Sequence, residues 1–178
     1  MLSADANRLT SGNVVKNLIR FAIPFLAANF LVSLYGAADV LIVSYFADSA
    51  ALAATATGAQ AVFTLMALAI GLAMGGTVLI GQYFGAKKEK DVLETITTVF
   101  SLFGMVSLAC AGLMLWLAGP ITDWLKTPAE AWTGTYHYIL ICGGGLIFTF
   151  AYESIGAVLR GLGDSKNPLK FVAIACAI

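Results

Sequence analysis

Charged residues are scarce in this sequence. Lys, Arg, Asp and Glu make up 11% of the 178 residues, whereas 60% are hydrophobic. Soluble domains carry about a quarter charged and about half apolar residues, so the composition excludes an ordinary soluble domain. The ten basic and ten acidic residues cancel to a formal net charge of zero, which gives no bulk attraction to nucleic acid. The chain is predicted to be an integral membrane protein.

Residues that build disulfides, metal sites and catalytic centres are also few. The three cysteines lie far apart inside apolar runs, a spacing that fits neither a disulfide framework nor a metal motif. The single histidine, His137, lies near one end of an apolar run and is interpreted as an interfacial residue rather than a proton relay. No nucleophile, base and orienting group occur together. An enzyme is therefore not expected, and neither is a cofactor.

Long apolar runs dominate what is present. A spanning helix needs about 20 apolar residues, because a rise of ~1.5 Å per residue must cross ~30 Å of hydrocarbon. The sequence predicts an all-α polytopic membrane protein with four complete transmembrane helices and the start of a fifth. The predicted spans are 18–46, 52–83, 92–117, 136–162 and the incomplete 168–178. Residues 1–12 are predicted to be a cytoplasmic tail, and 13–22 an amphipathic lead-in along the membrane surface.

Capping and turn residues separate the runs. Asp48 or Ser49 is predicted to cap the second helix, which Gly85 ends, and Asp91 with Glu94 resembles a capping box. Gly161 and Gly163 end the fourth helix. The connection 118–133 is the only long one, with room for a short interfacial helix over 121–126. Among the remaining glycines, Gly71, Gly75 and Gly76 are predicted to form a packing face, whereas a packing notch and a flexible point both stay open for 143–145.

Basic residues predict the orientation. An even alternation of spans places nine of the ten on one side of the membrane, which is cytoplasmic by the positive-inside rule. Lys126 is alone on the other side, where three tryptophans would form an aromatic belt. The nine are Arg8, Lys16, Arg20, Lys87, Lys88, Lys90, Arg160, Lys166 and Lys170, and the tryptophans are Trp116, Trp124 and Trp132.

Asp39 lies inside the first predicted span. A charged residue at the bilayer centre costs about 2.5–3.5 kcal/mol on insertion scales, so a carboxylate there indicates a function. Polar residues share its half of the helix circumference: Asn29, Ser33, Tyr35 and Gly36. Tyr35, one turn below, is in a position to hydrogen-bond Asp39. An acid removed from water takes up a proton near neutral pH or holds Na⁺, which is what an ion-coupled transporter needs. The alternative is a polar residue that joins two helices.

Two further residues of the predicted spans are singled out. Pro24 removes a backbone hydrogen bond and is predicted to act as a hinge in the first helix. Glu153 is a second intramembrane acid, about 10 Å from the inner boundary at Arg160. Functional and structural interpretations of Glu153 both stay open.

Several motifs together resemble the MATE (multidrug and toxic compound extrusion) family. They are Ile23-Pro24, Leu34-Tyr-Gly-Ala-Ala-Asp39, Ala51-Leu-Ala-Ala54, Gly71-Leu-Ala-Met-Gly-Gly76, Ile80-Gly-Gln-Tyr-Phe-Gly-Ala86 and, the most specific, Leu159-Arg-Gly-Leu-Gly-Asp-Ser-Lys-Asn-Pro168. The resemblance covers nearly the whole chain from Asn13 onward.

The resemblance implies twelve helices in two six-helix lobes, which export drugs and organic cations in exchange for Na⁺ or H⁺ by alternating access. Asp39 matches the cation-coupling acid of the family and Pro24 the proline at which the first helix bends, whereas Glu153 matches no family-wide acid. The chain ends inside the fifth helix, so it is interpreted as an N-terminal fragment that needs the missing C-terminal lobe. A multi-pass protein of the cell membrane, the inner membrane in bacteria, is expected, with lipid and small organic cations as partners.

Two other functions stay open. A lipid-linked oligosaccharide flippase of the same superfamily would line its cavity with basic residues, but no Lys or Arg lies inside a predicted span away from its ends. A non-transporting membrane scaffold would not need Asp39. The sequence does not choose between Na⁺ and H⁺, and no metal other than Na⁺ at Asp39 is expected.

Overall fold

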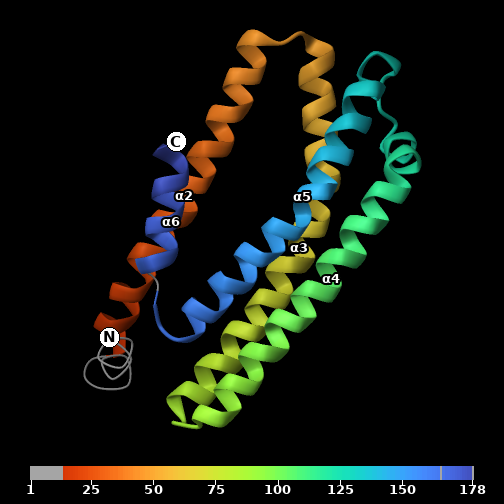
Figure 1. The fold of residues 1–178 in the computed structure, drawn as a ribbon. Helices are drawn as coiled ribbons and strands as arrows, with labels where there is room; N and C mark the ends of the chain where they lie inside the picture. Colours follow the sequence, from red (N-terminus) through yellow and green to blue (C-terminus); the bar gives the residue numbers. More distant parts are fainter. Residues whose placement is uncertain (1–13, 165, 178) are drawn as a thin grey trace. The chain divides into compact units, whose positions relative to one another are not determined.

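A computed structural model describes residues 14–164 and 166–177. These residues form five α-helices joined by short turns, without a strand (Figure 1). The helices are α2 (Val14–Phe46), α3 (Ser49–Gly85), α4 (Glu89–Trp124), α5 (Ala129–Gly161) and α6 (Lys166–Ala177). In the described part of the chain, α2 to α5 are long and apolar enough to cross a membrane. The predicted all-α fold with four complete spanning helices is therefore confirmed.

The helix ends follow the predicted capping residues at most positions. The Ala51 amide donates a 2.8 Å hydrogen bond to Oδ1 of Asp48, which therefore caps α3. Helices α3 and α5 end at Gly85 and Gly161 as predicted. Gly163, two residues beyond α5, has a φ of 83°, the left-handed conformation that favours glycine.

Lysines take the corresponding left-handed position after two other helices. Lys87 follows α3 with a φ of 58°, and Lys126 follows α4 with a φ of 51°. Next to Lys87, the Lys88 amide bonds back to the Tyr83 carbonyl at 3.0 Å, which closes the end of α3. The left-handed conformation at these two turns was not predictable from residue type, because lysine does not favour a positive φ.

The connection between α4 and α5 is shorter than predicted. Helix α4 continues through Pro120 to Trp124 and α5 begins at Ala129, so the expected loop 118–133 and its separate helix 121–126 do not form. A spanning helix tolerates proline where neighbouring polar groups satisfy the freed carbonyls. The Thr122 hydroxyl, for example, donates a 2.8 Å hydrogen bond to the Ala118 carbonyl. The helix therefore extends beyond residue 117, and the end of the membrane span at 117 stays a prediction.

The predicted capping box at the start of α4 is also wrong. The helix begins at Glu89, so Asp91 lies within the first turn and not before it. Both acids of the expected box instead pair with lysines: Asp91 with Lys88 at 3.6 Å and Glu94 with Lys90 at 3.9 Å. Negative charge in the first turn of a helix is stabilising by itself, because it complements the helix dipole.

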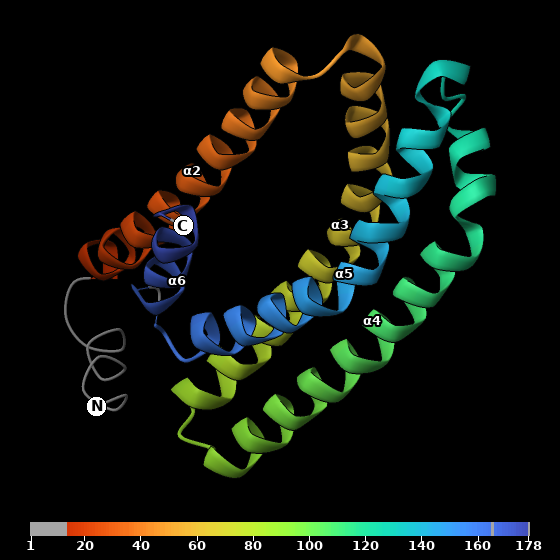
Figure 2. The ribbon, with the colours of Figure 1, turned by 45° about the horizontal axis from the view of Figure 1, so that its top comes forward.

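The chain divides into two compact units, and α2 to α5 each contribute residues to both. The second unit comprises Asp39–Leu72 and Phe100–Glu153. Its core includes Phe103 of α4 and Phe150 of α5, two fully buried rings whose centroids lie 6.0 Å apart in an edge-to-face arrangement. Figures 1 and 2 both show α4 and α5 running along each other.

The first unit comprises the described residues of Met1–Ala38, Ala73–Val99 and Ser154–Ile178. Its helices α3 and α5 approach closely. The Thr77 hydroxyl donates a 3.1 Å hydrogen bond to the Ala157 carbonyl. A methyl group added at Gly161 would lie 2.8 Å from Ile80 and 3.0 Å from the Thr77 carbonyl oxygen. Glycine is thus required at 161 for these two backbones to approach.

The other glycines fall into two groups: some lie against a neighbouring helix, and the rest have open space where a side chain would be. A methyl group at Gly76 would meet Val99 at 2.8 Å, so this glycine packs against α4 as predicted. Gly71 and Gly75 have no neighbour within 4 Å among the described residues, so their place in the packing face stays a prediction. In the triplet 143–145, Gly143 packs against Met114 at 3.0 Å, whereas the other two contact nothing within 4 Å. Gly143 is therefore the packing notch.

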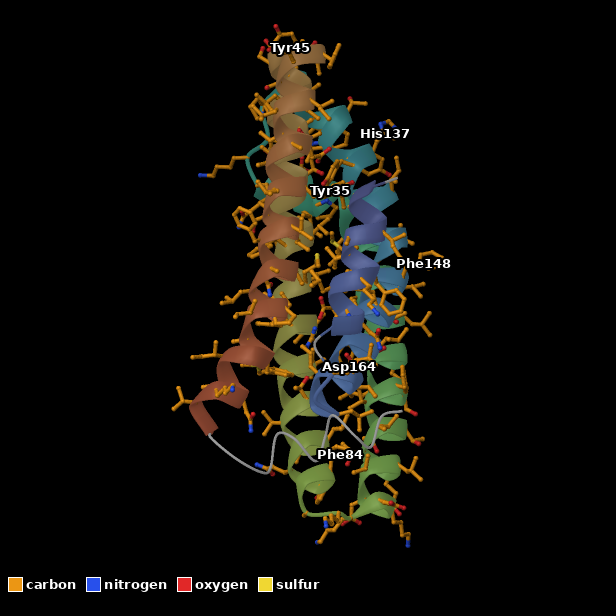
Figure 3. All side chains as sticks on the ribbon, turned by 90° about the vertical axis from the view of Figure 1, so that its left-hand side faces the viewer. Tyr35, Tyr45, Phe84, His137, Phe148 and Asp164 are labelled. Carbon is orange, nitrogen blue, oxygen red and sulfur yellow. The ribbon has the colours of Figure 1, made fainter. Side chains whose placement is uncertain are left out.

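Helix α2 contributes nothing to the buried core. None of its side chains that the structure describes is buried. Its aromatic residues are widely exposed, up to 88% for Tyr45 at its last turn (Figure 3). In a membrane protein an apolar exposed surface contacts lipid or another protein segment. The expected lead-in 13–22 is continuous with α2 from Val14 onward.

Candidate functional site

Asp39 lies in the last third of α2, seven residues before the end of the helix at Phe46. Its side chain is exposed, and it accepts no hydrogen bond from any residue that the structure describes. An unsatisfied carboxylate in an apolar helix is costly unless water, a cation or a polar partner reaches it. Asp39 is therefore in a position to bind a proton or a cation.

The hydrogen bond that the sequence allows between Tyr35 and Asp39 does not form. Tyr35, one turn earlier on α2, is 62% exposed (Figure 3). Asn29 and Ser33 bond to their own helix: the Asn29 amide donates to the Phe25 carbonyl at 2.9 Å and the Ser33 hydroxyl to the Asn29 carbonyl at 3.0 Å. Local bonds of this kind satisfy a polar side chain in an apolar environment. These residues form a polar stripe and do not contact Asp39.

Tyr138 of α5 lies within electrostatic range of Asp39. Both belong to the second unit. The phenol ring lies over Gly58 of α3, where a methyl group would meet ring atom Cδ1 at 2.5 Å. The absence of a side chain at Gly58 therefore leaves the space that the ring occupies. Cys142 lies one turn further along α5.

Sequence reasoning missed Tyr138 because a tyrosine near a helix end is typical of the membrane interface. Two signals pointed to it: Gly58, which follows an Ala-rich and Thr-rich stretch, and the spacing of four residues that places Tyr138 and Cys142 on one face of a helix. Neither signal identifies Asp39 as the neighbour, because that pairing depends on how α2 and α5 are placed in the second unit.

The remaining predicted residues lie apart from Asp39 in sequence and environment. Pro24 lies within α2, which continues through it. Glu153 is partly exposed on α5 and has an interaction partner. Arg160 folds back along its own helix, so that a methyl group at Gly156 would lie 2.9 Å from a guanidinium nitrogen. The described residues contain no group of three or more His, Cys, Asp or Glu that could hold a metal ion.

The chain is similar to known membrane transport proteins in sequence. Residues 24–178 match the MatE family. The chain is 30% identical over 169 residues to the probable multidrug resistance protein YpnP of Bacillus subtilis, a match that covers 95% of this chain and 38% of YpnP. It is 31% identical to the probable multidrug resistance protein YoeA of the same organism, with 93% of this chain and 36% of YoeA covered.

A third relative is the probable multidrug resistance protein NorM of Thermotoga maritima. It is 25% identical over 161 residues, which cover 86% of this chain and 33% of that protein. No solved structure matches the chain. The chain thus spans between about a third and two fifths of the length of these relatives.

Proposed function

The chain belongs to the MATE family of multidrug efflux transporters, and on this premise we propose that it forms part of the N-terminal lobe of a cation-coupled drug exporter. The proposed transporter moves drugs and organic cations out of the cell in exchange for Na⁺ or H⁺ by alternating access. The observation that carries the proposal is Asp39, an exposed carboxylate in an apolar spanning helix with no hydrogen bond from a described residue.

The proposed role of Asp39 is to change charge during transport. When it is ionised, the carboxylate attracts an organic cation or Na⁺, and when it takes up a proton its charge disappears. An ion that binds one conformation more tightly shifts the equilibrium toward that conformation by its difference in affinity. Binding of H⁺ or Na⁺ at Asp39 therefore weakens the hold on the exported cation and favours its release.

Tyr138 is proposed to tune this site. Its hydroxyl can donate a hydrogen bond to the ionised carboxylate, which stabilises the charged form relative to the neutral one. Because the ring lies over Gly58, where no side chain competes for its space, the group is held in one place. A fixed donor next to a coupling acid sets the ion concentration at which the acid switches.

The polar stripe of Asn29, Ser33 and Tyr35 is proposed to line the path that leads to Asp39, with Pro24 as the hinge of α2. Pro24 supplies no amide proton for the carbonyl one turn before it, so bending there breaks no hydrogen bond. Glu153 is proposed as a second acid of the cavity. In this proposal, Asp39 alone binds the coupling ion, and the other residues shape the cavity or let α2 bend.

The test uses the transporter in vesicles with an imposed Na⁺ or H⁺ gradient and a fluorescent organic cation. Asp39→Asn is expected to lower ion-driven efflux by about tenfold or more, within the range of typical coupling energies. Asp48→Asn is the matched control, because it makes the same change at a turn where asparagine still caps α3. Full ion-driven efflux by Asp39→Asn would overturn the proposed coupling role, whereas absence of ion-driven efflux from the parent protein would favour a scaffold.

A second variant tests the tuning residue. Tyr138→Phe keeps the ring over Gly58 and removes only the hydroxyl, so the fold is expected to be unchanged. A hydrogen bond to a charged group contributes about 1.5–3 kcal/mol, so the ion concentration for half-maximal efflux is expected to shift by about tenfold. Tyr45→Phe serves as the control, because Tyr45 is 88% exposed at the last turn of α2 and has no proposed role in the site. An equal shift in both variants would contradict a specific role of Tyr138.

The flippase alternative is separated by the same vesicles. A flippase would transfer a labelled lipid-linked oligosaccharide between leaflets without an ion gradient, whereas the proposed exporter is inactive on that substrate. The scarcity of basic residues between the ends of α2 to α5 supports the exporter, since an anionic lipid substrate needs cationic partners.

A further inference from the structure

Four side chains contact one another in a row where α4 meets α5: Asp123, Trp132, Tyr136 and His137. We call this row the α4–α5 clasp. The Trp132 indole N–H donates a 2.8 Å hydrogen bond to Oδ1 of Asp123. The Trp132 and Tyr136 rings are stacked, with centroids 5.4 Å apart and planes 7° from parallel. His137 lies edge-on to Tyr136 at 5.7 Å, and Figure 3 shows it on the outside of α5.

The hydrogen bond to Asp123 makes the Trp132 indole ring more electron-rich. Donation of the N–H to a carboxylate is charge-assisted, and it pushes electron density into the indole ring. Electron-rich aromatic faces attract cations, and tryptophan is the strongest of the natural side chains in this respect. Stacking with Tyr136 extends the flat surface, so a planar cation has a larger area against which to stack.

The charges around the clasp also favour a cation. Asp123 uses Oδ1 for the indole, and its other oxygen accepts no hydrogen bond from a described residue. Glu130 in the first turn of α5 is exposed, and Lys126 is the single basic residue between Asp123 and His137. Two acids against one base leave a formal charge of −1 beside the ring stack.

The clasp differs from the other tryptophans of the chain. Trp116 and Trp124 are 80% and 83% exposed and have no ring or hydrogen-bond partner among the described residues, which is typical of interfacial anchors. Trp132 is only partly exposed and has both a carboxylate and a stacked ring. An interfacial anchor alone requires neither of them.

We propose that the α4–α5 clasp is a binding site for planar organic cations, in which the Trp132 face stacks on the aromatic part and Asp123 compensates the positive charge. This site is separate in sequence from Asp39 and deepens the proposed function, on which the choice of ligand rests. Placed at the end of the spanning helices, it would hold a substrate cation close to the membrane surface.

The test measures equilibrium binding of ethidium, a planar cation, to the protein in a non-ionic detergent, by fluorescence anisotropy. Asp123→Asn keeps the acceptor for the indole N–H but removes the charge, and Trp132→Ala removes the stacking face. Each is expected to weaken ethidium binding by about two- to fivefold, the range for exposed cation–π and ion-pair contacts. Trp124→Ala, the matched control, is expected to bind like the parent protein.

Two comparisons make the result decisive. The uncharged planar compound acridone is expected to bind equally to the parent protein and Asp123→Asn, and equal ethidium binding by all variants would overturn the proposal. A parallel loss of acridone and ethidium binding in Asp123→Asn would overturn it as well, because the charge would then have no part. Addition of phosphatidylethanolamine is expected to leave ethidium binding unchanged, whereas competition would assign the site to lipid ammonium groups.

Failure of this proposal is distinguishable from failure of the proposed function. If the clasp variants bind normally while Asp39→Asn loses ion-driven efflux, the clasp proposal fails and the exporter stands. If no ion-driven efflux exists and the clasp variants still lose ethidium binding, the exporter fails and the binding site stands.

Discussion

Lys87 adopts a backbone conformation that is unfavourable for any residue with a side chain. Its φ of 58° lies in the left-handed region, which costs an L-residue about 1–2 kcal/mol. Glycine removes that cost, but part of the gain is offset because glycine loses more conformational freedom on folding. We expect Lys87→Gly to raise the free energy of unfolding by about 0.5–1 kcal/mol, measured by denaturant titration in detergent.

Gln82 provides the control for this change. It is exposed in the last turn of α3, where the backbone is helical. Glycine inside a helix costs about 1 kcal/mol, so Gln82→Gly is expected to lower the stability. Destabilisation by Lys87→Gly of the same size would mean that the lysine side chain itself stabilises the turn.

At the level of whole helices, the close approach of α3 and α5 in the first unit depends on Gly161. A methyl group at Gly161 would meet both a side chain and the Thr77 carbonyl oxygen, so the two helices must separate to make room. We expect Gly161→Ala to lower the free energy of unfolding by about 1–3 kcal/mol, the usual cost of overpacking. The measurement is unfolding in mixed detergent micelles, followed by circular dichroism.

Gly144 is the matched control on the same helix. It has no neighbour within 4 Å, so alanine fits there and gains helix propensity. Gly144→Ala is expected to raise the stability by up to about 1 kcal/mol. Equal losses from both substitutions would show that the loss at 161 does not arise from the contact with α3.

The helices themselves were predictable because the length of an apolar run is enough to define a spanning helix. Runs of about 20 apolar residues fix the spans, and Asp48, Gly85 and Gly161 mark their ends. The end of α4 was not predictable in this way. Proline is a stop signal in water, but in an apolar environment the alternative to a helix is a set of unsatisfied backbone groups, so α4 continues through Pro120 to Trp124.

Only the residues of the candidate site that lie on α2 were predictable from the sequence. Asp39 and its polar stripe follow from residue type and helical spacing on α2. Tyr138 did not follow, because its electrostatic interaction with Asp39 joins residues about a hundred positions apart in the sequence. Gly71 and Gly76 show the same limit: both fit a packing motif, yet only Gly76 has a neighbour at 2.8 Å.

Orientation in the membrane is a property of the whole molecule. Three lysines lie between residues 87 and 90 at the α3–α4 turn, whereas Lys126 alone lies at the α4–α5 turn. We expect the first turn to be cytoplasmic. In a variant without native cysteines, a cysteine replacing Lys126 is expected to react with an impermeant thiol reagent in intact cells.

A cysteine replacing Lys87 is expected to react with the same reagent only in inverted vesicles. Both positions are exposed, so access is limited by the membrane and not by burial. Labelling of the Lys87 position in intact cells, with no labelling at position 126, would reverse the predicted orientation.

The hydrogen bond from Thr77 to Ala157 joins residues 80 positions apart. A ribosome adds about 5–20 residues per second, so α3 leaves the ribosome about 4–16 s before the part of α5 that it contacts. During that interval the face of α3 around Thr77 and Ile80 lacks its partner from α5. Assembly of the first unit is therefore limited by the pace of synthesis, and a codon change that slows translation between 77 and 157 lengthens the time for which that face is open to other membrane proteins.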